Sequence, residues 1–155
     1  MALMSYKKNI AIIYTSITGN TKELAEIIES EFRKLSIYPV IYQANLFPME
    51  ILGTFDAVIV GTYTWGNGTL PREILPIYNG FETQDVSEVV TGVIGTGDSF
   101  YPNFCGAVDE FRDMLFVQSR LAATLKVELK PQMTDLPRCK RFVESILKCV
   151  EKVKN

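Results

Sequence analysis

The chain has 155 residues and a formal net charge of −2; 47% of its residues are apolar and 22% are charged, which is typical of a globular domain with a full hydrophobic core. This balance does not favour a nucleic-acid partner, and no apolar run approaches the roughly 20 residues that a membrane-spanning helix needs. The chain contains no histidine, which excludes Ser-His and Cys-His nucleophiles and any His-ligated metal site.

The three cysteines, Cys105, Cys139 and Cys149, are an odd number without the spacing of a metal site. They predict reduced thiols in a cytoplasmic protein, and no metal site is expected. Residues 1–9 include lysines but no apolar stretch long enough for a signal peptide, which favours the same location.

The pattern of apolar residues alternates between short buried runs and helical spacing. Residues 55–62 are apolar on both faces, as in a central parallel strand, whereas Pro39 cannot donate to a ladder and predicts an edge strand. Residues 45–54 are expected to form an irregular connector with one helical turn. In chain order, strands are predicted at residues 10–14, 37–42, 55–62, 89–95 and 125–129, and helices at 22–35, 71–80, 103–119 and from Thr134 onward.

Strands that alternate with helices predict an α/β fold with a parallel sheet, and the length suits one domain over residues 1–155. In open sheets of this kind, ligands bind outside the carboxyl ends of the strands. Three segments follow predicted strand ends, namely residues 15–21, 63–70 and 96–105. We therefore expect the function to reside in these three loops.

The first loop changes abruptly from an Ile-rich run to small hydroxyl residues around Gly19, just before a predicted helix. A helix N-terminus offers unpaired amide groups and the positive end of a dipole, so this turn is suited to hold an anion such as a phosphate. The alternative is an ordinary strand-to-helix turn in which Asn20 and Glu23 form a plain capping box. The residues of this loop alone leave both interpretations open.

The second loop holds the only tryptophan, Trp65, among two glycines and an asparagine. A tryptophan there is poorly placed for the core and well placed to stack on a flat ligand, although it could instead anchor the loop to its own domain. The third loop adds Tyr101 and Asp98. Two aromatic residues on neighbouring loops could hold one planar ring between them.

Other motifs are absent. Residues 19–22 do not form a Walker A loop, and residues 95–97 lack the third glycine of the dinucleotide fingerprint. Cys105 lies at the start of a predicted helix, where the helix dipole could lower its pKa, but it is interpreted as a structural thiol.

Taken together, the three loops resemble those of the flavodoxins, small FMN-binding electron carriers. Residues 16–21 fit the phosphate loop [ST]-x-T-G-x-T of the family, residues 64–66 fit the loop whose tryptophan lies on the inner face of the flavin, and residues 97–101 fit the loop whose tyrosine covers the outer face. Residues 104–109 continue the match, and nothing interrupts the last strand. The resemblance implies a short-chain member, with a doubly wound five-stranded parallel sheet in the order 2-1-3-4-5 and helices on both faces.

The resemblance also implies FMN as the cofactor, and it implies a set of binding residues in the three loops but no catalytic residue. The implied partners are a flavodoxin/ferredoxin reductase and soluble electron-acceptor enzymes, bound transiently by a monomer that contacts neither nucleic acid nor membrane. Asn67 and Thr69 stand where many relatives carry acidic residues. The expected cofactor-binding residues are Ser16, Ile17, Thr18, Gly19, Asn20, Thr21, Tyr63, Thr64, Trp65, Gly66, Asn67, Thr96, Gly97, Asp98, Tyr101, Asn103, Phe104 and Cys105.

By this likeness the protein is a low-potential carrier of single electrons that works through the semiquinone and hydroquinone states of its flavin. The likeness further implies that the peptide after Gly66 turns over on the first reduction and stabilises a blue neutral semiquinone. The loops contain no obvious general base, which favours a carrier over an enzyme. The alternatives are a flavodoxin-like activator of a ribonucleotide reductase and an FMN-dependent quinone or nitro reductase.

Overall fold

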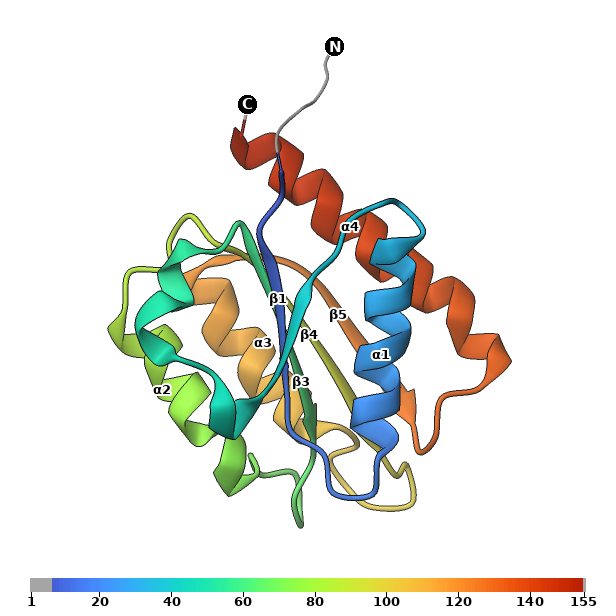
Figure 1. Cartoon of the computed structure of the whole chain (residues 1–155). Coiled ribbons are helices and arrows are strands. Elements are labelled where there is room, and N and C mark those ends of the chain that lie inside the picture. Colours follow the sequence, from blue (N-terminus) through green and yellow to red (C-terminus); the bar gives the residue numbers. More distant parts are fainter. Residues whose placement is uncertain (1–6, 155) are drawn as a thin grey trace.

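The computed structural model describes residues 7–154, whose strands form one parallel sheet (Figure 1). The sheet has the order β2-β1-β3-β4-β5, and every neighbouring pair is parallel, which confirms the predicted topology. The strands are β1 (Ile10–Tyr14), β2 (Val40–Gln43), β3 (Ala57–Tyr63), β4 (Val90–Gly97) and β5 (Arg120–Glu128).

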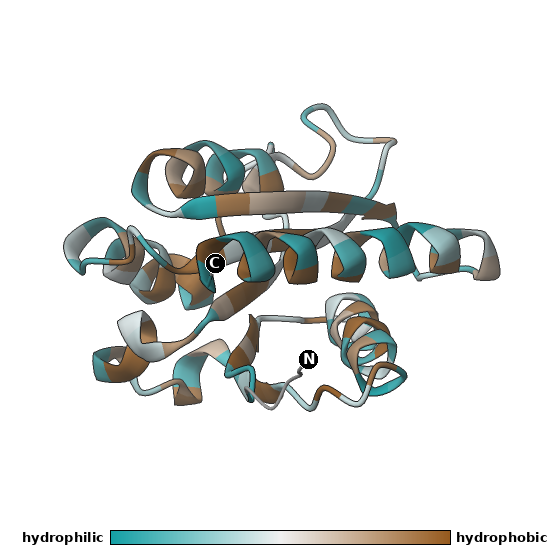
Figure 2. Cartoon of the chain, turned by 90° about the horizontal axis from the view of Figure 1, so that it is seen from above, coloured by the Kyte–Doolittle hydropathy of each residue, from teal (hydrophilic) through white to brown (hydrophobic). Residues whose placement is uncertain are grey.

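Helices cover both faces of the sheet, as the doubly wound fold requires (Figure 1). One face packs against α1 (Asn20–Arg33) and α4 (Leu136–Lys154), and the other against α2 (Leu75–Thr83) and α3 (Gly106–Gln118). Apolar and polar positions alternate along these helices, so each turns an apolar side to the sheet (Figure 2). Among residues 7–154, no helix is both long and apolar enough to cross a membrane.

The central strands are buried on both faces, and this explains their unbroken apolar sequences. Every residue of β1 is buried, and so is every residue of β3 except the last. The edge strand β2 is partly exposed and begins directly after Pro39, in agreement with the predicted edge position.

Several element boundaries differ from the predicted ones for identifiable reasons. Helix α3 begins at Gly106 rather than at Asn103, because Asn103 and Cys105 adopt left-handed conformations with φ of 60° and 53°. Gly80 was expected to end α2, but the helix continues to Thr83. Gly80 packs against Met49 so closely that a Cβ would lie 2.1 Å from the methionine Cε.

The last strand is the largest difference, since β5 begins at Arg120 and not at Leu125. A register irregularity opposite Thr91 and Gly92 leaves Ala122 as an extra residue, and two consecutive alanines give a weak strand signal. Helix α1 begins two residues earlier than predicted, and the connector at 45–54 contains 3₁₀ turns at Ala44–Leu46 and Met49–Thr54.

The parallel arrangement brings the carboxyl ends of all strands to one edge of the sheet, the lower one in Figure 1. The loops after β1, β3 and β4 meet there. The fold therefore assembles the three segments that the sequence analysis singled out.

Candidate functional site

The three loops and the residue after β5 enclose a cavity of about 710 Å³. All the predicted binding residues line it except Ser16, Gly19 and Asn67. Pro102 and Leu129 also line it, and neither was predicted. The sheet order places the end of β5 beside the third loop. The position of Leu129 next to that loop could therefore have predicted that Leu129 lines the cavity.

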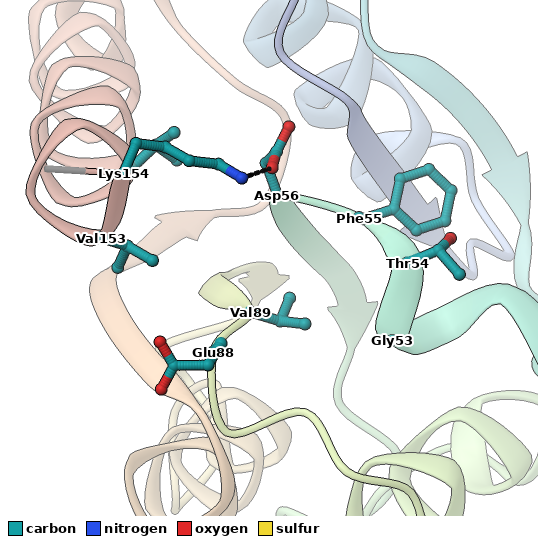
Figure 3. A pocket seen from close by; sticks show the side chains of 9 residues that line it. Gly53, Thr54, Phe55, Asp56, Glu88, Val89, Val153 and Lys154 are labelled. Atoms are coloured by element: carbon teal, nitrogen blue, oxygen red, sulfur yellow. Dashed lines mark ion pairs between the residues drawn. The ribbon is translucent and has the colours of Figure 1, made fainter.

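A different cavity, of about 360 Å³, lies at the opposite edge of the sheet (Figure 3). Its lining includes Asp56 and Lys154, whose side chains form an ion pair of 3.1 Å. None of the strand-end loops contributes to it. By the rule that open α/β sheets bind ligands at the carboxyl ends of their strands, the larger cavity is the candidate site.

The first loop is folded by its own serine. The Ser16 hydroxyl accepts hydrogen bonds from the amides of Gly19 (3.2 Å) and Lys22 (3.3 Å), and Ser16 does not belong to the lining of the larger cavity. Gly19 precedes α1 with φ of 95°, a conformation that favours glycine. The plain capping box is wrong, because Asn20 is the first helical residue and the N-cap position is occupied by Gly19, which has no side chain.

Two buried hydroxyls join the first loop to β4. The Oγ1 atoms of Thr21 and Thr96 lie 2.7 Å apart, and the two residues are 1% and 4% exposed. Whichever hydroxyl donates, its partner keeps one hydrogen that can be donated elsewhere. Thr21 therefore joins two walls of the cavity in addition to lining it.

Two of the four aromatic residues that line the cavity are mostly exposed rather than packed in the core. Trp65 is 59% exposed and Tyr101 is 57% exposed, so Trp65 does not anchor its loop to the domain interior. Trp65 begins a tight turn. The Trp65 carbonyl accepts hydrogen bonds from the Gly68 amide (3.2 Å) and from the amide and hydroxyl of Thr69 (both 2.9 Å). Gly66 and Gly68 have φ of 52° and 104°, which explains the two glycines of this turn.

The third loop is tied to the end of β5. The Leu129 amide donates to the Gly97 carbonyl at 2.7 Å, and the Ser99 hydroxyl donates to Glu128. Within residues 7–154, four residues other than glycine have positive φ, and three of them, Asn103, Cys105 and Leu129, line the cavity. Backbone strain of this kind gathers at functional sites, because the surrounding structure must hold it in place.

Burial raises the pKa of two groups in the cavity wall, those of Tyr63 and Cys105. Burial, together with a 2.6 Å hydrogen bond to Glu73 and the charge of Glu73, raises the pKa of the Tyr63 phenol. Burial raises the pKa of the Cys105 thiol to about 12, so this thiol is not a nucleophile at neutral pH. Asp98 is the only charged side chain among the described residues that line the cavity.

This arrangement can hold a flat ring between aromatic side chains and an anionic group at a helix N-terminus. The first turn of α1 supplies amides without acceptors inside the helix, and Thr18 and Asn20 add neutral donors in the same wall. No lysine or arginine belongs to the described lining. An anionic group would therefore be bound by amides and hydroxyls.

Comparisons with known proteins agree with this geometry. The chain is 35% identical over 141 residues to probable flavodoxin 1 of Bacillus subtilis, with 88% of each chain covered, and 31% identical over 130 residues to a flavodoxin of Maridesulfovibrio salexigens, with 81% and 89% covered. The crystal structure of oxidised flavodoxin 1 from Bacillus cereus has a TM-score of 0.83 at 31% identity, with 91% of this chain and 98% of the other covered. The family model described as Flavodoxin matches residues 12–141, so the chain belongs to the flavodoxins, a family of FMN-binding proteins that transfer electrons and are not enzymes.

Proposed function

We propose that this flavodoxin carries single electrons from a reductase to soluble redox enzymes in the cytoplasm, acting as a monomer with FMN held in the cavity at the carboxyl edge of the sheet. The observation that supports the proposal best is the pairing of two exposed aromatic side chains with a helix N-terminus in one cavity. A flat ring linked to a phosphate matches both parts. The predicted FMN-binding residues remain part of this proposal.

The phosphate is assigned to the first turn of α1. Backbone amides, the Thr18 hydroxyl and the Asn20 amide would donate to it, and the helix dipole favours its negative charge. Ser16 contributes indirectly, because it holds the amides of Gly19 and Lys22 in the folded loop.

The ring is assigned to the space beside Trp65 and Tyr101. FMN supplies the one-electron chemistry, and the protein sets how readily the electron is given up. Apolar walls and the Asp98 carboxylate disfavour additional negative charge at this place. Each penalty of about 1.4 kcal/mol on the reduced form lowers a one-electron potential by about 59 mV, so a few such contacts make a strong reductant.

Calorimetry on the apoprotein with FMN and with riboflavin tests the phosphate assignment. Hydrogen bonds to a charged group contribute about 1.5–3 kcal/mol each, so FMN should bind at least tenfold more tightly than riboflavin. Thr18→Ala should narrow this difference, whereas Thr83→Ala, a change of the same type at the end of α2, should leave it unchanged. Equal affinities for the two flavins would refute the assignment.

The carrier role is tested with the FMN-loaded protein. A ferredoxin reductase with NADPH should reduce the flavin, and the visible spectrum should return when a soluble acceptor enzyme is added. Steady turnover of a quinone with NADPH alone, without any reductase, would contradict the proposal. Sedimentation of the loaded protein tests the monomer.

A further inference from the structure

Three carbonyls of the turn from Trp65 to Thr69 accept hydrogen bonds, and those of Gly66 and Gly68 accept none from the described residues. Of these two glycines, only Gly66 lines the cavity. The Trp65 carbonyl accepts three hydrogen bonds inside the turn, and the Asn67 carbonyl accepts one of 2.9 Å from the side-chain amide of Asn103. Gly66 lies between these two residues.

Asn103 reaches the turn from a different loop, 36 residues away in sequence. Its own φ is 60°, a conformation that asparagine tolerates better than most residues do. The two segments meet closely: a Cβ on Gly68 would lie 2.7 Å from the Asn103 Cβ, and a Cβ on Gly106 would lie 2.7 Å from the Gly68 carbonyl oxygen. The amide of Ala107 also donates to the Thr64 hydroxyl at 3.2 Å.

We propose that Asn103 is a positioning residue: its side-chain amide fixes the Asn67 carbonyl, so that the Gly66 carbonyl is the one open acceptor that the turn offers to the bound flavin at the cavity wall. The proposal rests on the proposed binding of FMN in this cavity. The Asn67 carbonyl belongs to the peptide after Asn67, so holding it leaves the peptide between Gly66 and Asn67 able to rotate. Asn103 therefore restricts the turn to the one peptide that contacts the ligand.

The consequence is a difference between redox states. Reduction of a flavin adds a proton to the ring and creates a hydrogen-bond donor, for which a free carbonyl is the natural acceptor. If the rest of the turn is already fixed, the turn loses little conformational entropy when the Gly66 carbonyl accepts a hydrogen bond from the flavin. Without the amide of Asn103, the turn has more conformations, and the form that uses this carbonyl is disfavoured relative to the other redox states.

Two variants with opposite side effects test the proposal. Asn103→Gly keeps the positive φ and adds flexibility, and Asn103→Asp keeps the shape and adds charge; both lose the amide donor. Loss of one hydrogen bond should disfavour the one-electron-reduced form about fivefold relative to the other two redox states. At 59 mV per tenfold, the first one-electron potential falls and the second rises by about 40 mV each, so the gap between them narrows by about 80 mV. Ser36→Gly is the matched control, because Ser36 has φ of 61° and does not line the cavity.

Hydrogen exchange of the apoproteins gives a readout that does not depend on FMN. The amides of Gly68 and Thr69 should exchange several-fold faster in both Asn103 variants than in the wild type and in Ser36→Gly. An unchanged gap between the potentials with unchanged exchange would overturn the proposal, as would a change in only one of the two variants. A wild type that does not bind FMN would refute the proposed function instead, and the exchange of the turn would then decide the role of Asn103.

Discussion

Replacing the buried hydroxyl pair of Thr21 and Thr96 by valine, singly and together, tests whether this pair joins the first loop to β4. The two Oγ1 atoms lie 2.7 Å apart, and neither residue is more than 4% exposed. Valine keeps the shape of threonine, so each variant removes a hydroxyl without creating a cavity of appreciable size. The perturbation is therefore the hydrogen bond itself.

A single replacement leaves one hydroxyl buried without its partner, which costs about 1–3 kcal/mol. The double replacement leaves two apolar groups in contact and is expected to cost less than the sum of the single ones, because no buried hydroxyl is left unsatisfied. The coupling between the two positions should be about 1–2 kcal/mol, within the range measured for residues in contact.

Urea unfolding of the four apoproteins measures the coupling from shifts of the midpoint at constant slope. Thr21→Ser is the control, since it keeps the hydroxyl. If the two single losses add within about 0.5 kcal/mol in the double variant, the hydroxyls do not stabilise the fold through each other and the reasoning is wrong.

Three further predictions concern the turn, the aromatic wall and the thiols. Gly66→Ala should reduce the fraction of flavin trapped in the one-electron-reduced form several-fold. Rotation of the peptide after Gly66, whose φ is 52°, changes ψ toward a region that disfavours an alanine by about 1 kcal/mol or more, although the space around its Cβ is open. Gly66→Asn should have a smaller effect, and equal long-wavelength absorbance in both variants and the wild type would contradict this. Tyr101→Ala should raise the potential of the second reduction, because water then reaches the flavin, and a potentiometric titration measures this potential. In the wild type, FMN should quench the fluorescence of Trp65. Burial raises the pKa of Cys105 to about 12 and of Cys139 to about 11. Above pH 9 the unfolded chain therefore loses thiol protons that the folded chain keeps. The free energy of unfolding should fall from pH 9 to pH 11, and it should fall less steeply in Cys139→Ala.

Much of the fold was predictable because the buried central strands have unbroken apolar sequences. The first strand was predicted with its correct bounds, since its five residues are all buried and a change of composition marks its end. Prediction failed where long-range contacts decide the local structure. Gly80 continues its helix because Met49 packs on it, and β5 begins early because its register with β4, rather than its composition, sets its bounds.

In the candidate site, too, the sequence predicted some features and missed those that depend on long-range contacts. Most residues that line the cavity were identified because the three loops together match one family pattern, although no single loop decided between the interpretations. Ser16 and Asn67 were expected in the wall but serve the loops themselves, and this depends on hydrogen bonds that spacing does not reveal: the Ser16 hydroxyl binds two amides of its own loop, and the Asn67 carbonyl binds Asn103. Leu129 was missed because the predicted last strand included it, whereas β5 ends at Glu128 and leaves Leu129 in the loop that follows.

Leu129 offers a test of whether the strain at this cavity is real. Its φ is 53° and its side chain is 48% exposed, so it combines a disfavoured backbone with limited apolar burial. Leu129→Ala removes the side chain and keeps the strain, whereas Leu129→Asn removes the same apolar group and relieves part of the strain, since asparagine tolerates positive φ.

The two variants lose similar apolar burial, about 1 kcal/mol for a half-buried leucine. The asparagine variant should therefore be the more stable apoprotein by about 1 kcal/mol, seen as a higher urea midpoint. Both should bind FMN more weakly than the wild type, because both shorten the cavity wall. A midpoint for Leu129→Ala equal to or above that of Leu129→Asn would mean that the backbone at this position carries no strain, and that the positive φ values around the cavity are not held there against a cost.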